Sequence, residues 1–222
     1  MSIGIKIKLN EGLYLKNPQD SDLGRKILQQ SINLINEIGF ESFNFKKLAS
    51  KINSTEASIY RYFENKHVLL IYLISWYWEW LNYLIYLKTL NITNPKEKLK
   101  IVIKTFIFAN NEKAATDFIN QENLHNLVIT EGTKTYHSKA VDDENRKGFF
   151  LSYKNLVAEV AEIIKEVNPQ FPYPHALASN LFEMANHHVY CADHLPKLTD
   201  VHHNTNNEVE MMLNYFTDKL LQ

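Results

Sequence analysis

The chain has 222 residues and a formal net charge of −1, and 45% of its residues are hydrophobic, which is enough to bury a core and excludes an intrinsically disordered chain. A single cysteine excludes an intrachain disulfide framework and is typical of a reducing compartment. Because the first dozen residues lack the continuous apolar segment of a signal peptide, we expect a cytoplasmic protein.

The amino-terminal segment, residues 1–20, alternates isoleucine with glycine and lysine and then reaches a turn-like sequence from Lys16 to Asp20. It could be a mobile basic arm that reaches a nucleic-acid backbone, as the arms of other DNA-binding domains do. It could also be a loosely ordered terminus, which is common at chain ends. The pattern favours the loosely ordered terminus.

The first predicted helix starts at Ser21 or Asp22, either of which can cap it, and ends near Gly39, a residue type that is common just after a helix. Its apolar residues recur at the helical period, at Leu23, Ile27, Leu28, Ile35 and Ile38. The helix therefore has one apolar face, which can support the helices that follow.

Two short helices are predicted next, at residues 44–52 and 55–63, on either side of a break at Asn53. Asparagine tolerates the left-handed backbone conformation that usually needs glycine. Thr55 can cap the second helix by accepting a hydrogen bond from one of its free N–H groups. Two short helices around a three-residue turn form a helix-turn-helix, whose second helix enters the major groove of DNA.

This stretch resembles the amino-terminal domain of the TetR family of bacterial transcriptional regulators, over about residues 23–72. The agreement lies at fixed offsets, at Gly39, Phe40, Ala49, Asn53, Ile59, Tyr60, Phe63, Lys66, Leu69 and Leu70. The chain departs from the family at two positions, since Asn53 stands where the family usually has glycine and Asn44 where it usually has threonine or serine. Asparagine can serve as a left-handed residue and as a helix cap, so the predicted fold is unchanged.

Side chains near the start of the second motif helix are expected to read DNA. A carboxylate can accept from cytosine N4, a small apolar side chain can meet the thymine methyl group, and a hydroxyl can bond a base or a phosphate. Glu56 has an alternative role, because a carboxylate also favours the amino end of a helix. The resemblance implies that Tyr60 and Tyr62 contact the DNA backbone. The full expected DNA-binding set is Asn44, Lys46, Thr55, Glu56, Ala57, Ser58, Tyr60, Tyr62 and Lys66.

A long helix is predicted from Lys66 to about Leu90, and its apolar surface is wide enough to need partners on several sides. Within it, residues 68–87 approach the roughly 20 apolar residues of a membrane span. Glu79 lies near the middle of this stretch and belongs to a polar stripe along it. We therefore expect a soluble protein without a membrane partner.

The rest of the chain predicts further helices and no strand of consequence. The helical stretches are 94–110, 113–132, 146–167, 175–195 and 206–222, with a loop or frayed helix start at 132–145. The last two helices carry apolar stripes beyond what one domain must bury, which predicts an isologous contact between two copies of the chain. The alternative is that these stripes are simply core. The family resemblance implies a four-helix arrangement at the contact.

The long helix is unusually aromatic, and the simpler interpretation is packing of the core. The alternative is a pocket for a small apolar or aromatic effector, lined by Trp76, Trp80, Tyr83, Phe106, Phe118 and Tyr153. His187, Cys191 and His194 share one face of a helix and are of metal-ligating types. Because no fixed fourth ligand is identifiable, we predict no metal and no other cofactor.

The sequence thus predicts an all-α protein with a three-helix helix-turn-helix DNA-binding domain at residues 1–66. A long helix joins it to a helical-bundle ligand and dimerisation domain at residues 67–222. Residues 1–70 hold 10 basic and 7 acidic residues, an excess that suits a nucleic-acid partner. No nucleophile–base arrangement, glycine-rich phosphate loop or HExxH motif supports catalysis, so we expect no enzyme activity.

The predicted function is a ligand-responsive transcriptional regulator, a repressor, that binds a palindromic operator in double-stranded DNA as a homodimer through its two carboxy-terminal helices. The alternative is an all-helical small-molecule or metal-binding protein without a DNA-reading role. The run from Thr55 to Lys66 separates the two, because an element that only packs has no need for exposed hydroxyl and basic side chains.

Overall fold

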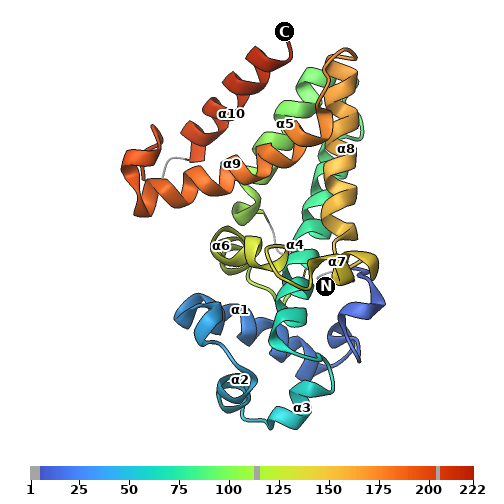
Figure 1. The fold of residues 1–222 in the computed structure, drawn as a ribbon, viewed down its shortest axis with the longest axis vertical. Helices are drawn as coiled ribbons and strands as arrows, with labels where there is room; N and C mark the ends of the chain where they lie inside the picture. Colours follow the sequence, from blue (N-terminus) through green and yellow to red (C-terminus); the bar gives the residue numbers. More distant parts are fainter. Residues whose placement is uncertain (1–5, 113–115, 204–205) are drawn as a thin grey trace. The chain divides into compact units, whose positions relative to one another are not determined.

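A computed structural model describes residues 6–112, 116–203 and 206–222 (Figure 1). Most of these residues lie in helices, as the helical periodicity of the sequence predicts. The helices are α1 Asp22–Ser42, α2 Phe45–Lys51, α3 Glu56–Tyr60, α4 Lys66–Thr89, α5 Pro95–Ile107, α6 Gln121–Glu131, α7 Val141–Arg146, α8 Leu151–Val167, α9 Pro174–His194 and α10 Asn206–Leu220. Short 3₁₀ turns lie at Glu11–Leu13, Pro18–Asp20, Ala109–Asn111, Gly132–Thr135 and Pro196–Leu198. No strand occurs in the described residues, and the all-α prediction is confirmed.

The predicted helix boundaries hold best where a cap or a proline marks them. Ser21 caps α1 by accepting from Gly24 N at 3.2 Å, and Asn94 caps α5 by accepting from Lys96 N at 2.9 Å. Two predictions are corrected. The helix expected over 113–132 begins only at Gln121, and the stretch from 132 to 145 holds a 3₁₀ turn and most of α7. Residues 113–115 lie outside the described part of the chain.

The chain divides into two compact units. Unit 1 comprises residues 1–80 and 110–152, and unit 2 comprises residues 81–109 and 153–222. Helix α4 begins in unit 1 and ends in unit 2. The boundary expected after residue 66 separates a DNA-binding part from a ligand and dimerisation part, whereas the two units are defined by their internal contacts. The expected boundary stays a prediction.

Unit 1 is built around the first part of α4, whose apolar surface extends all the way round the helix. Tyr72, Trp76, Tyr77 and Trp80 are all buried, with Trp76 and Trp80 stacked at 6.5 Å between ring centroids. By length and composition α4 could cross a membrane, yet 78% of its most apolar window is buried inside the protein. A core helix that needs partners on every side accounts for this composition.

Helix α6 joins α1 in unit 1 through amide side chains. Asn36 Nδ2 donates to the main-chain oxygen of Asn123 at 2.7 Å, and Asn126 Nδ2 donates to Asn36 Oδ1 at 3.0 Å. Asn123 Nδ2 donates to Asn33 Oδ1 at 3.0 Å. These bonds fix α6 along the helix that supports the helix-turn-helix.

Unit 2 combines α5, α8, α9, α10 and the end of α4. Helix α10 packs against α5 and α9. Phe106 of α5 meets Phe182 of α9 edge-on at 4.8 Å, and Lys98 of α5 pairs with Glu166 of α8 at 3.1 Å. Aromatic packing inside and ion pairs outside therefore join these helices.

A buried polar pair connects α4 and α6 in the core of unit 1. The hydroxyl of Tyr77 and Nδ1 of His125 share a hydrogen bond of 2.7 Å. Burial lowers the pKa of His125 to about 4, because the charged imidazolium would be removed from water. His125 is therefore neutral in the folded protein at neutral pH.

This pair predicts a loss of stability in acid. Between pH 6.5 and about 4 an unfolded chain protonates His125 while the folded chain does not, so the free energy of unfolding decreases as pH falls through this window. The expected decrease is on the order of 3 kcal/mol. His125→Gln, which does not titrate, should flatten this dependence in urea unfolding at pH 7, 5.5 and 4. The wild-type protein is the reference, and equal slopes in the wild-type protein and in His125→Gln would contradict the assignment.

Candidate nucleic-acid interface

The turn between α2 and α3 is fixed by asparagine at two points. Asn44 caps α2 by accepting from Lys47 N at 2.9 Å. Asn53 has a φ of 53°, so it adopts the left-handed conformation predicted for it. Ser54 N donates back to the oxygen of Ala49 at 2.9 Å and closes the end of α2. The structural roles predicted for both asparagines are confirmed.

The second motif helix, α3, is only five residues long and ends earlier than predicted. Thr55 caps it by accepting from Ser58 N at 3.2 Å, and the two hydroxyls also bond each other at 3.0 Å. After Tyr60 the chain turns, because Tyr62 N and Phe63 N both donate to the oxygen of Ile59. The Phe63 ring is fully buried and meets Tyr72 of α4 edge-on at 5.3 Å. Burial of Tyr62 and Phe63 therefore ends the helix.

The leading edge of α3 is open to solvent. Glu56 and Ala57 are exposed and Ser58 is half-buried. Tyr60 is 49% exposed although its ring meets Phe45 of α2 edge-on at 4.9 Å. Lys46 is exposed on α2. These side chains offer a carboxylate, a methyl group, hydroxyls and a cation, which suit base edges and phosphates.

Tyr62 is corrected from a DNA-contacting residue to a structural one. Its side chain is only 3% exposed, and its hydroxyl bonds Ser21 Oγ at 2.8 Å. Ser21 is the cap of α1, so this bond joins the end of α3 to the start of α1. The expectation that Tyr62 is exposed is wrong, because the sequence does not show that a hydroxyl 41 residues away receives it.

Lys66 is likewise corrected. Its ammonium group donates to three main-chain oxygens at the end of α1, those of Phe40 at 3.0 Å, Glu41 at 3.1 Å and Phe43 at 3.0 Å. An ammonium group has three donors, so this arrangement uses all of them and leaves none for a phosphate. Lys66 also lies over the Phe40 ring at 4.7 Å. It joins the start of α4 to the end of α1.

Phe40 is held from a second side by α6. Its N–H donates to Glu131 Oε1 at 2.9 Å, just after Gly39, whose φ of 74° interrupts α1. Glu131 also pairs with Lys134 at 2.7 Å. Opposite charges from α4 and α6 therefore hold the two main-chain groups of Phe40. The role of Glu131 is not visible in the sequence, because its partner Phe40 is 91 residues away.

Comparison with known proteins agrees with this geometry. Residues 27–73 match the sequence profile described as bacterial regulatory proteins, tetR family. Residues 27–73 therefore form a helix-turn-helix domain of the TetR family. The TetR match covers α2 and α3 completely and includes most of α1 and the start of α4. No curated protein sequence matches the chain.

Several solved structures resemble this chain in fold at low sequence identity. A putative TetR-family transcriptional regulator from Syntrophomonas wolfei has a TM-score of 0.65 at 19% identity, covering 90% of this chain and 96% of its own. The fatty acid degradation regulator FadR from Bacillus halodurans has a TM-score of 0.61 at 16% identity, covering 88% and 93%. AibR, solved with isovaleryl coenzyme A and operator DNA, has a TM-score of 0.59 at 15% identity, covering 86% and 97%.

The aromatic residues predicted to line an effector pocket fall into two groups. In unit 1, Trp76 and Trp80 are buried and Phe118 is half-buried. In unit 2, Phe106 is buried, Tyr83 is 40% exposed, and the hydroxyl of Tyr153 donates to Glu183 at 3.4 Å. Burial and the acidic neighbour raise the pKa of Tyr153 above its usual range. The pocket stays a prediction.

The histidine and cysteine positions on α9 do not converge. His187 Nε2 lies 3.6 Å from Cys191 Sγ, whereas His194 packs its ring on Tyr190 at 4.4 Å. Within residues 6–112, 116–203 and 206–222, no group of three or more His, Cys, Asp or Glu side chains is arranged to hold a metal ion.

The correction of Lys66 generates a stability prediction. Lys66→Met removes a charged donor from three oxygens, so we expect the free energy of unfolding to fall by about 1–3 kcal/mol. Lys47→Met is the matched control, because Lys47 is exposed and donates only to the oxygen of Ser42 at 2.8 Å. Its expected change is within about 0.5 kcal/mol. Equal stability of the two variants in urea unfolding would show that Lys66 does not hold α1.

Proposed function

We propose that the protein is a ligand-responsive repressor that binds a palindromic operator as a homodimer. The observation that carries this proposal is the exposed leading edge of α3 on a rigidly held helix-turn-helix. The carboxylate of Glu56 and the methyl group of Ala57 are exposed and have no evident packing role. The TetR-family match over residues 27–73 supports the same function. The alternative without DNA reading does not account for this edge.

In this proposal Glu56, Ala57 and Ser58 face base edges in the major groove. Base edges carry the sequence information, whereas contacts to phosphate fix register and orientation. Asn44, Lys46, Thr55 and Tyr60 surround that edge and contact the backbone. Tyr62 is left out of the contact set because its side chain is buried, and Lys66 because all three of its donors bond main-chain oxygens.

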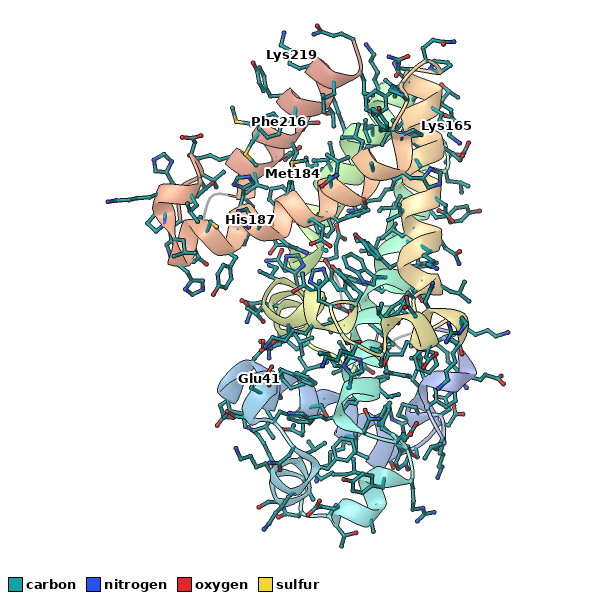
Figure 2. The ribbon with its side chains drawn as sticks, in the orientation of Figure 1. Glu41, Lys165, Met184, His187, Phe216 and Lys219 are labelled. Atoms are coloured by element: carbon teal, nitrogen blue, oxygen red, sulfur yellow. The ribbon has the colours of Figure 1, made fainter. Side chains whose placement is uncertain are left out.

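The dimer would form through α9 and α10, which pack against each other in unit 2. Met211 and Tyr215, one turn apart on α10, are 71% and 61% exposed in the single chain. Figure 2 labels Met184 and His187 on α9 and Phe216 and Lys219 on α10, the two helices of the proposed contact. A twofold axis through such a surface presents two α3 helices to a palindromic site.

The effector in this proposal is a small apolar or aromatic molecule. Some structural relatives support ligand control, since AibR was solved with isovaleryl coenzyme A and operator DNA. An effector that binds better to a conformer with wrongly spaced α3 helices shifts the population away from DNA. Helix α4 is suited to this coupling because it is continuous between unit 1 and unit 2.

Selection from a random duplex pool tests the function directly. We expect the full-length protein to enrich a palindrome whose half-sites lie about one helical turn or more apart. Size-exclusion chromatography with light scattering should give twice the chain mass. If no sequence is enriched above the input pool, the protein does not read DNA in the way proposed. Enrichment of an asymmetric site would contradict the proposed dimer but not the reading of DNA.

Variants on the exposed edge test the docking. Tyr60→Phe should weaken binding to the selected duplex by roughly 1 kcal/mol through loss of one hydrogen bond, with the dimer intact. Lys46→Ala should reduce the slope of log affinity against log salt by about one, because one phosphate contact is lost. The control is Lys139→Ala, an exposed lysine that precedes α7. Fluorescence anisotropy across salt concentration measures all three. Variants that match the control would place the interface elsewhere.

A further inference from the structure

A segment ahead of the family match forms an ordered strap, which we define as residues 6–20. Ile7, Leu9 and Leu13 are buried, and the side chain of Gln19 bonds both main-chain groups of Ile7, accepting from N at 3.3 Å and donating to O at 2.7 Å. The loosely ordered terminus expected here is therefore wrong for residues 6–20, because the alternating isoleucine and leucine side chains find a core. Residues 1–5 lie outside the described part.

The strap is anchored at Asn10 to the turn between α7 and α8. Asn10 Nδ2 donates to the oxygens of Lys147 at 2.9 Å and Gly148 at 3.1 Å, while its Oδ1 accepts from Gly12 N at 2.8 Å. A Cβ atom at Gly12 would lie 3.0 Å from the ring of Phe149. The oxygen of Phe149 in turn accepts from Ser75 of α4 at 3.3 Å. The part of the strap around Asn10 and Gly12 is therefore anchored to the core of unit 1.

The strap is also anchored, at Leu15 and Lys16, to the chain just after α3. Leu15 N donates to the oxygen of Tyr62 at 2.8 Å, and the ammonium group of Lys16 lies 5.3 Å from the centre of the Tyr62 ring. Tyr14 meets Tyr72 of α4 edge-on at 6.1 Å. Together with the bond from Ser21 to the Tyr62 hydroxyl, these contacts fix both the main chain and the side chain of Tyr62.

A glycine in α1 leaves room for the strap to pass close to the helix. The strap's second turn, Pro18–Asp20, lies directly on Gly24, and a Cβ atom there would come within 2.2 Å of the oxygen of Pro18 and 2.6 Å of its Cα. Both are main-chain atoms, so a change of side-chain rotamer cannot relieve the clash. Any residue larger than glycine at position 24 must therefore move the strap or the helix.

We infer that the strap is a brace that sets the aim of α3, and that sequence-specific DNA reading depends on it. The inference rests on the proposed DNA-binding function. A five-residue helix has too few internal hydrogen bonds to hold its own direction, so its two ends decide where its leading edge points. The strap fixes the end at Tyr62 from the α7–α8 turn. Gly24, Asn10 and Tyr62 are positioning residues, and none of them contacts DNA.

A displaced brace has a distinct signature. Phosphate attraction depends on charge and persists when a helix is misaimed, whereas base contacts require the helix to lie in register. Loss of the brace should therefore weaken binding to the selected duplex while binding to a scrambled duplex of equal length, and its salt slope, stay the same. A purely structural role would lower the melting temperature without changing this ratio.

The test compares Gly24→Ala and Asn10→Ala with Gly132→Ala in the full-length protein. Alanine favours a helix more than glycine does, so Gly24→Ala does not weaken α1 itself. Both strap variants should bind the selected duplex about tenfold more weakly, the cost of roughly one mismatched base pair. Gly132→Ala is the matched control, because its Cβ would make an ordinary contact 3.7 Å from Val128 Cγ1. Binding to the scrambled duplex should agree among all three within about twofold.

Limited trypsin digestion at Lys8 and Lys16 reports whether the strap is released, and circular dichroism reports folding. If Gly24→Ala does not fold, Asn10→Ala carries the comparison, since it removes side-chain bonds and adds no bulk. Operator affinity equal to that of Gly132→Ala in both folded variants overturns the brace, whatever the digestion shows. Failure of the wild-type protein to select any sequence is a different outcome, which rejects the DNA-binding function itself.

Discussion

A five-residue helix cannot hold its own conformation in water, and this constraint governs the amino-terminal part of the molecule. The start of α3 is set by the Thr55 cap, and its end is set by Tyr62 and Phe63, which are buried against neighbouring segments. Cooperative packing replaces the internal hydrogen bonds that a longer helix would have. A short helix held in this way exposes most of its surface while staying fixed, which suits a reading element.

The supports of the helix-turn-helix come from distant parts of the chain. Lys66 at the start of α4 and Glu131 at the end of α6 grip Phe40 from its two main-chain groups. Ser21 at the start of α1 receives Tyr62. The asparagine bonds between α1 and α6 continue the same connection along the helix. Polar side chains therefore make the long-range links, and aromatic side chains fill the space between them.

The sequence predicted what is decided locally. Periodicity identified the helices, and Asn44 and Asn53 were predicted from the conformations that asparagine tolerates within its own turn. Tyr62 and Lys66 were misassigned because their partners lie 41 and 23 to 26 residues away, and spacing along a chain does not reveal such pairs. Asn10 is further still from Lys147, at 137 residues. The sequence therefore did not reveal how the strap is anchored, and of its buried apolar residues only Ile7 belonged to the alternating pattern that was noted.

Gly24 records the course of the preceding chain within the helix that it belongs to. Position 24 must be glycine for the strap to take this course, because the backbone at Pro18 occupies the volume that a Cβ would need. Two features that look independent in the printed sequence, a glycine inside a helix and the strap before it, are thus linked by one steric contact. A larger residue at position 24 would force the strap onto another route or shift α1, so this one position constrains the path of the segment before it.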